Sequence, residues 1–571
     1  MQKKQQSLII IMLHNSCSIF FIFFLYLGIS CYISTNGHAA SLGHYTLSCP
    51  SFNNSISFSE WFGTNLPFIF YDPSQYNYDV FIEGMKQLNI SHVRIPIHWS
   101  VLEPQNGILE PTYVSRLDFT MDKLSKANIS SLFFIAGSPK WISSNPSASN
   151  YDQYPPTSVE PFILRVKWLL ERYAMKGLEI IQIWNEVNLP SFWAPMEDPQ
   201  AYTHLLNATF TELRNFTHSS FSSHVIQIAM SGMAYFSEMP YHDMNPMFYS
   251  LEPLGAFNYC DIVSYHPYYN TPEGNIPQQN VYDFEIKAQL AQQFLSKFGK
   301  KIYATEWGWS TYASDFSEQP FITLTQQADY ILKRLIMLMY LCFDRVYQFA
   351  LFDFPPVGFS TRDTYYGIFN ASTSAMPNSL PGKPSFYALR NFLNFIGNQH
   401  PHNSLHSTPK LIIPKVNDPG NMHSFTVQNS NGDVLWMYWT SMNSSNNQSM
   451  TLDTSLIKDI LNQTMNTSST SIVVTFSVYD PIENVLEANG IVEDLNRVTV
   501  NVHTTFRVAK FSFSKSMINS SPSPPKQSSF KPKDSKRVSQ AAFTTWDYHP
   551  LRFGFMFIMI VLTQVLILLE Q

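Results

Sequence analysis

The chain is poor in cysteine and in charge. Its 571 residues include 5 cysteines, and Lys, Arg, Asp and Glu make up only 14% of it. No long basic run and no Cys/His spacing typical of zinc ligands occurs, which argues against a nucleic-acid partner. No metal or organic cofactor is indicated either. The 45% hydrophobic content argues against disorder along the whole chain, and the length predicts about two to three domains.

The few cysteines cannot form a disulfide framework. Cys17 and Cys31 lie in a leader segment, which leaves Cys49, Cys260 and Cys342. These three allow one bridge and one free thiol. Because Cys260 and Cys342 fall in apolar elements, we expect both to be packing residues.

The N-terminus has the pattern of a secretory signal peptide. Two lysines precede a long apolar stretch, and small residues at Ala39 and Ala40 offer a cleavage site. An uncleaved anchor helix is the alternative. Sequons for N-linked glycans agree with secretion. They lie at Asn53, Asn89, Asn128, Asn207, Asn215, Asn370, Asn443, Asn447, Asn462, Asn466 and Asn519.

The C-terminus has the order of segments that a GPI-attachment signal requires. Small residues at Ser539, Ala541 and Ala542 precede a polar spacer, and an apolar tail runs from Phe553 to Leu569. A C-terminal membrane helix is the alternative, although the tail is short for the ~20 residues that such a helix needs. We therefore expect a glycoprotein on the extracellular face of the plasma membrane or in the cell wall, held by a GPI anchor.

Short apolar runs alternate with helical patterns between about Glu60 and Gly397. This alternation predicts β-α units and a parallel sheet. The runs are EWFGTNLPF, SHVRIPI, SSLFFIA, LEIIQIWNE, VIQIAMSG, CDIVSYHP, KIYATEWG and DRVYQFALFD. Eight such units close naturally into an α/β (β/α)8 TIM barrel. The alternative, a doubly wound open sheet, would need a glycine-rich first turn, which is absent.

The residue pattern of the sequence changes after about His400. Alternating, β-branched segments such as HSFTVQNSNGDVLWMYWT, with a hairpin turn at NSNGD, predict a smaller all-β domain of sandwich type. A segment rich in Ser, Pro and Lys follows and predicts an extended linker or stalk. The expected organisation is a signal peptide (1–39), a barrel (40–399), a β-rich domain (400–516), a linker (517–540) and the anchoring tail (541–571).

Polar residues stand where several predicted barrel strands end. The active site of such a barrel lies at these carboxyl ends. The residues are Arg94 and His98 after the second strand, Asn185 and Glu186 after the fourth, His266 and Tyr268 after the sixth, and Glu306, Trp307 and Trp309 after the seventh. Two glutamates therefore face one rim, as the hydrolysis of a glycosidic bond requires.

The two carboxyl groups need opposite protonation states. One must donate a proton to the leaving oxygen, and the other must be ionised to attack the anomeric carbon or to activate water. A separation of ~5 Å gives retention of configuration and ~6.5–9.5 Å gives inversion. Arg94 can keep one carboxylate ionised, and Tyr268 can hydrogen-bond the same oxygen and orient it. Asn185 can bind a sugar hydroxyl. The tryptophans offer flat faces to a sugar ring.

At this point the motifs carry a resemblance. WNEVN and TEWGW, together with RIPIHW and YHPYY, resemble the retaining glycoside hydrolases of the (β/α)8 "four-seven" clan, which includes families 5, 30 and 39. The resemblance implies that Glu186 is the acid/base and Glu306 the nucleophile. It also implies that Asn185 binds the 2-hydroxyl. The substrate would be an oligosaccharide, a polysaccharide or another glycoside, with no cofactor.

The supporting residues are less specific. Arg94, His266 and Tyr268 match the clan's supporting residues, and SPKWI resembles its third strand exit, which implies a position for Trp141 near the sugar. His98 and His266 can instead be hydrogen-bonded structural residues, and Trp141, Trp307 and Trp309 can be packing residues.

One feature departs from the clan. Many members place a tryptophan at the eighth strand exit, whereas this chain reads YQFALFDFPP there. Phe349, Phe352 or Phe354 can take its place, so the sugar is left open. Three functions remain: a retaining β-glycoside hydrolase, a transglycosylase that uses the same glutamates on cell-wall or matrix glycans, and a non-catalytic carbohydrate-binding surface protein.

Overall fold

The computed structural model describes most of the chain between residues 56 and 515. The described ranges are 56–68, 72–74, 76–220, 225–235, 246–276, 281–312, 321–354, 362–370, 382–396, 404–410, 422–429, 433–440, 449–451, 472–492, 499–501 and 503–515. The expected signal peptide, linker and anchoring tail lie outside these ranges. Within the ranges, no helix has the length and hydropathy needed to cross a bilayer.

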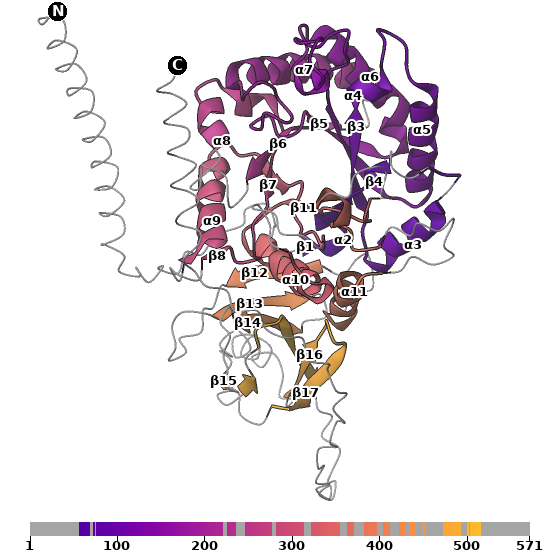
Figure 1. Ribbon diagram of the computed structural model, residues 1–571. Coiled ribbons are helices and arrows are strands. Elements are labelled where there is room, and N and C mark those ends of the chain that lie inside the picture. Colours follow the sequence, from indigo (N-terminus) through magenta and orange to yellow (C-terminus); the bar gives the residue numbers. More distant parts are fainter. Residues whose placement is uncertain are drawn as a thin grey trace, which may run out of the picture. The chain divides into compact units, whose positions relative to one another are not determined.

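Eight parallel strands close into a barrel (Figure 1). They are β2 (Phe62–Asn65), β3 (His92–His98), β4 (Ser130–Ala136), β5 (Leu178–Ile183), β6 (Gln227–Tyr235), β7 (Ile262–Pro267), β10 (Lys301–Ala304) and β11 (Arg345–Gln348). Their order is β10-β11-β2-β3-β4-β5-β6-β7. Six strands lie within their predicted apolar runs, and β3 and β6 extend past the ends of theirs, at Ile97 and Gly232. The barrel prediction is therefore confirmed.

Helices surround the ring of strands in Figure 1. The longer ones are α3 (Tyr78–Gln87), α5 (Pro111–Lys126), α6 (Glu160–Tyr173), α7 (Pro199–Ser220), α9 (Asp283–Ser296), α10 (Leu324–Tyr340) and α11 (Pro384–Ile396), with the short α8 (Pro246–Leu251) before β7. Each turns an apolar face toward the barrel, because apolar residues recur every three to four positions.

Two of these helices end in the same way. Asn89 after α3 and Asn128 after α5 have left-handed backbone conformations, with φ of 54° and 55°. The next amide, of Ile90 or Ile129, donates to a carbonyl one turn back, of Met85 or Leu124. This is a Schellman motif, in which asparagine accepts the left-handed position at lower cost than most side chains. The chain then enters the next barrel strand.

A separate antiparallel sheet follows the barrel in sequence. Its order is β1-β12-β13-β14-β19-β16-β17. The bounds are β1 (Ile56–Ser57), β12 (Ser404–Lys410), β13 (Met422–Asn429), β14 (Val434–Thr440), β16 (Ile472–Asp480), β17 (Val485–Ile491) and β19 (Arg507–Lys515). Smaller pairs are β15 (Ser449–Thr451) with β18 (Thr499–Asn501), and β8 (Asn275–Ile276) with β9 (Val281–Tyr282). The first strand, β1, precedes the barrel in sequence, which the sequence reading did not predict.

Helix α10 packs against both the barrel and this sheet, so nearly all of its side chains are buried. Lys333 donates to the backbone carbonyl of Thr504 at 2.7 Å, and Asp329 accepts from the Phe506 amide at 2.7 Å. The Tyr340 ring lies 5.4 Å from that of Phe425 in β13. Polar and apolar contacts therefore join the two parts.

The cysteine prediction is half right. Cys260 is free and buried, as expected of a packing residue. The prediction for Cys342 is wrong, because it is disulfide-bonded. Cys342 lies in the turn between α10 and β11 with a φ of 62°. It therefore follows the end of an apolar helix instead of lying inside an element. The sequence did not show this end, because the apolar residues continue past it.

Candidate active site

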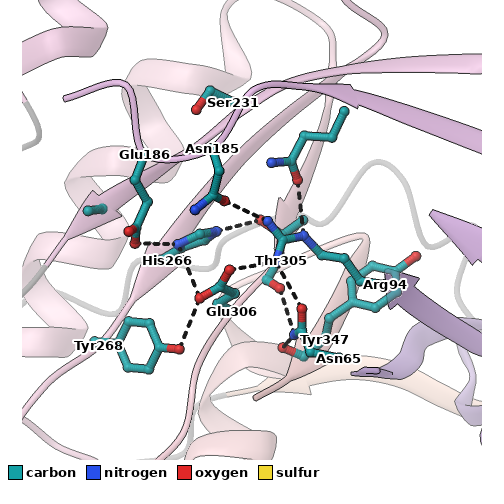
Figure 2. Close-up of polar contacts among 12 residues, drawn as sticks. Asn65, Arg94, Asn185, Glu186, Ser231, His266, Tyr268, Thr305, Glu306 and Tyr347 are labelled. Atoms are coloured by element: carbon teal, nitrogen blue, oxygen red, sulfur yellow. Dashed lines mark hydrogen bonds and ion pairs between the residues drawn. The ribbon is translucent and has the colours of Figure 1, made fainter. Parts of the chain in front are cut away.

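The strand exits bring most of the predicted polar residues together. Figure 2 shows Arg94, Asn185, Glu186, His266 and Glu306 as one network of hydrogen bonds and ion pairs, with side chains pointing toward a common centre. They come from β3, the exit of β5, β7 and the exit of β10. All five are buried, with exposed fractions between 0% and 9%. A network this well buried must satisfy its own polar groups, so each partner restricts the next.

The carboxylate of Glu306 has a cation and a hydroxyl group as neighbours. Arg94 Nη1 lies 2.5 Å from its Oε1, and the Tyr268 hydroxyl donates to its Oε2 at 3.2 Å. Both contacts hold the carboxylate in place. The sequence prediction put Arg94 and Tyr268 on the same oxygen, whereas the structure puts them on the two different oxygens of Glu306.

The guanidinium of Arg94 is held in a fixed orientation. Its Nη1 donates to Asn65 Oδ1 at 2.8 Å, its Nη2 to Asn185 Oδ1 at 2.7 Å and its Nε to Gln182 Oε1 at 3.2 Å. The Phe134 ring lies 4.1 Å from the guanidinium carbon. Because Asn185 uses its oxygen here, its amide nitrogen is the group left to face a substrate.

Glu186 has a different environment. His266 Nδ1 lies 2.7 Å from Glu186 Oε1, and His266 Nε2 lies 3.1 Å from Thr305 Oγ1. Burial raises the pKa of Glu186 to about 8, against an opposing effect of Arg94. Burial also lowers the pKa of His266 to about 3. At neutral pH the pair is therefore a protonated carboxyl group beside a neutral imidazole.

The two carboxyl groups are close. Oxygens of Glu186 and Glu306 and a ring nitrogen of His266 lie within 4.8 Å of one another. Two carboxylates and an imidazole could also ligate a metal ion. The guanidinium of Arg94, however, already supplies a positive charge to Glu306, and it would repel a divalent cation.

The backbone after β5 turns in order to present Glu186. Trp184 and Glu186 have left-handed φ values of 69° and 43°, each of which costs on the order of 1–3 kcal/mol for a non-glycine residue. The Trp184 amide donates to Ile135 O and the Glu186 amide to Gly232 O, both at 3.0 Å. Bonds to both neighbouring strands therefore hold the strained segment.

Four members of the network were missed from the sequence: Asn65, Gln182, Gly232 and Thr305. A Cβ atom at Gly232 would lie 2.2 Å from His266 Nε2 and 2.8 Å from Thr305 Oγ1, so only glycine leaves room for the imidazole. Gln182 is a polar residue inside an apolar strand, and Asn65 and Thr305 stand at strand ends. These features of the sequence could have identified the three polar residues.

Two predicted residues lie near the site but outside the network. His98 is exposed. Trp141 is half-buried, and its indole N–H donates to the Glu103 carbonyl at 3.0 Å. In the described ranges, neither hydrogen-bonds to Glu186 or Glu306. A role in substrate binding stays a prediction for both.

The two tryptophans after Glu306 are buried. Trp307 is 0% and Trp309 1% exposed. The Trp309 indole N–H donates to the Tyr269 carbonyl at 2.8 Å. Both rings therefore pack inside the protein, and a role in substrate binding stays a prediction for both.

Of the three candidate phenylalanines at the eighth strand exit, Phe349 is best placed. It is half-buried, and its amide donates to the carbonyl of Trp307 at 2.8 Å. Its ring lies 5.4 Å from that of Tyr366, which lies 5.9 Å from that of Tyr268. Phe352 is 1% exposed and packs in the core.

Comparisons with known proteins agree with the fold. The family model "Cellulase (glycosyl hydrolase family 5)" matches residues 51–340. A family 39 glycoside hydrolase from Bacteroides cellulosilyticus WH2 is similar in structure, with a TM-score of 0.52 and 14% identity, over 80% of this chain and 81% of that one. A family 39 β-xylosidase from Caulobacter crescentus gives a TM-score of 0.48 at 14% identity, over 81% and 98% of the two chains. A search of curated proteins gives no match. At 14% identity the likeness to the Bacteroides structure shows the fold alone.

Proposed function

Because the chain belongs to the cellulase family, glycosyl hydrolase family 5, it is a glycoside hydrolase, and we propose that it cleaves β-glycosides with retention of configuration. In this proposal Glu306 is the nucleophile and Glu186 is the acid/base. The observation that carries it is the pairing of the two carboxyl groups within 4.8 Å. Carboxyl groups lie ~5–5.5 Å apart in retaining enzymes and ~6.5–9.5 Å apart in inverting ones, so this short approach between their oxygens favours retention.

The first chemical step forms a glycosyl-enzyme. Ionised Glu306 attacks the anomeric carbon while the bond from that carbon to the leaving oxygen breaks. Glu186 transfers its proton to this oxygen, so the alcohol departs neutral. The raised pKa of Glu186, about 8, supports this assignment because the proton is then present at neutral pH.

The second step releases the sugar. Glu186, now ionised, takes a proton from water, whose oxygen attacks the anomeric carbon and displaces Glu306. His266 stays neutral because of its low pKa and lies 2.7 Å from Glu186. Its Nδ1 accepts from the protonated carboxyl group, which leaves the Nε2 proton for Thr305.

Binding the sugar is the proposed role of Asn185. Its oxygen is engaged by Arg94 at 2.7 Å, so its amide N–H groups can donate to the 2-hydroxyl beside the cleaved bond. A hydrogen bond at that hydroxyl strengthens in the transition state. Phe349 is the proposed aromatic surface at the eighth strand exit.

We also propose the cellular setting that the terminal sequences predict. A secreted glycoprotein held by a GPI anchor would act on oligosaccharides or polysaccharides at the cell surface or in the wall. The support is the order of small, polar and apolar segments at the C-terminus together with the leader. Release of the expressed protein from cells by a phosphatidylinositol-specific phospholipase would test this, and retention would favour a membrane helix.

The activity test is a substrate panel with matched variants. The secreted form, about residues 41–520, is assayed on aryl β-glycosides and on β-glucan, xylan and mannan polymers. Glu306→Ala and the isosteric Glu306→Gln serve as controls. We expect turnover that both variants lose and an initial product with the β configuration. Turnover that survives in both variants, or an α product, would overturn the assignment.

A further inference from the structure

A buried arginine outside the catalytic network holds the loop that carries Tyr268. Arg334 lies in α10 and is 0% exposed. Its Nη1 donates to Pro267 O at 2.5 Å, and its Nε and Nη2 donate to Pro272 O at 3.1 and 2.7 Å. Its Nη2 also reaches Thr271 O at 3.2 Å. One guanidinium therefore binds three carbonyls of the segment that follows β7.

The surroundings of the Arg334 guanidinium are unusual for a buried charge. Among the described residues, its hydrogen bonds go to backbone carbonyls and not to a carboxylate. Its guanidinium carbon lies 3.4 Å from the centre of the Phe284 ring and 5.1 Å from that of Trp309. Burial lowers the pKa of the guanidinium to about 9, which leaves it charged at neutral pH. Burial of a charge is costly, and these carbonyls and ring faces offset the cost.

The carbonyl of Pro267 lies between two residues of the site. His266, on one side, contacts Glu186 at 2.7 Å. Tyr268, on the other side, donates to Glu306 at 3.2 Å. The Tyr268 amide also donates back to His266 O at 2.8 Å, so the segment turns sharply here. A bond to the Pro267 carbonyl therefore fixes the point from which the tyrosine reaches the carboxylate.

The far end of the same segment is held by the antiparallel sheet. The indole N–H of Trp439 in β14 donates to Glu273 Oε1 at 2.6 Å, and Lys333 Nζ lies 3.7 Å from the same oxygen. Lys333 precedes Arg334 on α10. Two successive cations of one helix thus contact the two ends of the segment, one toward the sheet and one toward the barrel.

We propose that Arg334 is a positioning residue for the glycosidase reaction, which acts by holding the His266–Glu273 segment so that Tyr268 meets Glu306. The inference rests on the proposed function, because it assumes that Glu306 is the nucleophile. On this account the antiparallel sheet is part of the scaffold of the active site, through Trp439 and Glu273, and is not an independent module.

The test is a double-mutant cycle between Arg334→Lys and Tyr268→Phe. Lysine keeps the charge but cannot bind three carbonyls at fixed angles. We expect Arg334→Lys to lower kcat by about tenfold to a hundredfold, as small misplacements near a reacting group do, with little change in KM. In the Tyr268→Phe background the same substitution should have almost no further effect, because the contact it positions is already gone.

Arg345→Lys is the matched control. Arg345 starts β11 at the opposite end of the barrel, and its Nε donates to Glu60 O at 2.8 Å. It should change the melting temperature without changing kcat. Additive losses in the cycle, or an unchanged kcat in folded Arg334→Lys, would overturn the inference. Activity that survives in Glu306→Ala would instead overturn the proposed function.

A milder variant covers the case in which Arg334→Lys does not fold. Glu273→Gln removes the ion pair with Lys333 but keeps an oxygen that can accept from Trp439. We expect a smaller loss of kcat, again absent in the Tyr268→Phe background. A loss of equal size in both backgrounds would leave Arg334 and Glu273 as stability residues only, and the positioning role would be rejected.

Discussion

Glu186 and Glu306 are the same residue type, lie within 4.8 Å and yet have opposite surroundings. Glu306 is paired with the Arg94 guanidinium and accepts from the Tyr268 hydroxyl. Glu186 is buried beside a neutral imidazole. Two ionised carboxylates about 5 Å apart would repel by roughly 3 kcal/mol at an effective dielectric constant of 20. The neighbours therefore decide which of the two carries the proton.

The largest effect should come from removing the proton donor. Glu186→Gln should lower the rate on substrates with poor leaving groups by about 10²–10⁴-fold, the usual worth of a general acid. Aryl glycosides with acidic phenols should keep most of their rate of glycosyl-enzyme formation, because their departure needs no proton. Burst kinetics on both substrate classes measures the difference. An equal collapse on both would assign Glu186 another role.

The second effect concerns the other carboxylate. Arg94→Lys keeps a positive charge but cannot bind Asn65, Asn185 and Gln182 together, so Glu306 loses a fixed partner. We expect kcat/KM to fall by about a hundredfold. Unlike Glu186→Gln, this loss should be the same for good and poor leaving groups. A loss confined to poor leaving groups would show that Arg94 acts on Glu186, the proton donor. It would contradict the claim that the two carboxyl groups have separate partners.

The third effect is the pH dependence of the wild-type enzyme. The proposed mechanism requires the protonated form of Glu186, whose pKa burial raises to about 8. Activity should therefore persist through neutral pH and fall roughly tenfold per unit above about pH 8. The basic limb of kcat/KM for a poor leaving group measures this. A fall that begins near pH 5 would mean that the carboxyl group is not protected from ionisation.

The smallest effect is on stability. The folded-state pKa of Glu186 is raised from 4.5 to about 8, so its contribution to stability is complete below about pH 4.5 and is lost as the pH rises through 8. Glu186→Gln should thus melt above the wild type by a margin that grows over this window. The margin should be largest above about pH 8, where the carboxyl group of the folded wild type also ionises.

Differential scanning calorimetry from pH 4 to 9 would measure that margin. Glu171→Gln, at an exposed position on α6, is the control for the chemical change alone and should follow the wild type. A constant margin at all pH values would show that Glu186 does not titrate between the folded and unfolded states in this window.

The strand pattern predicted the barrel because each strand is a contiguous apolar run. The two glutamates were found because they end such runs in order. Asn65 and Thr305 were missed because a single polar residue at a strand end is common, and their partners are far away in sequence. Gly232 was missed for another reason: its importance lies in the space that it leaves for His266. No local pattern encodes that space.

Long-range contacts explain the other differences. Strand β1 pairs with β12, so Ile56 lies opposite Leu405. It was not predicted because a strand of two residues is too short to show an alternating pattern. Arg334 looked like one basic residue of an amphipathic helix. Only the fold shows that α10 lies between the barrel and the sheet, where this side chain is buried.

The left-handed asparagines after α3 and α5 bear on how sugars could be attached to the protein itself. Both belong to Asn-Ile-Ser sequons. The side-chain nitrogen of Asn89 is buried, whereas Asn128 is exposed. The folded chain thus offers Asn128 to a modifying enzyme and withholds Asn89. An oligosaccharide found on Asn89 would have been added before the α3–β3 turn closed. The fraction of chains that carry it would therefore compare the rate of folding of the first half of the barrel with the rate of translocation.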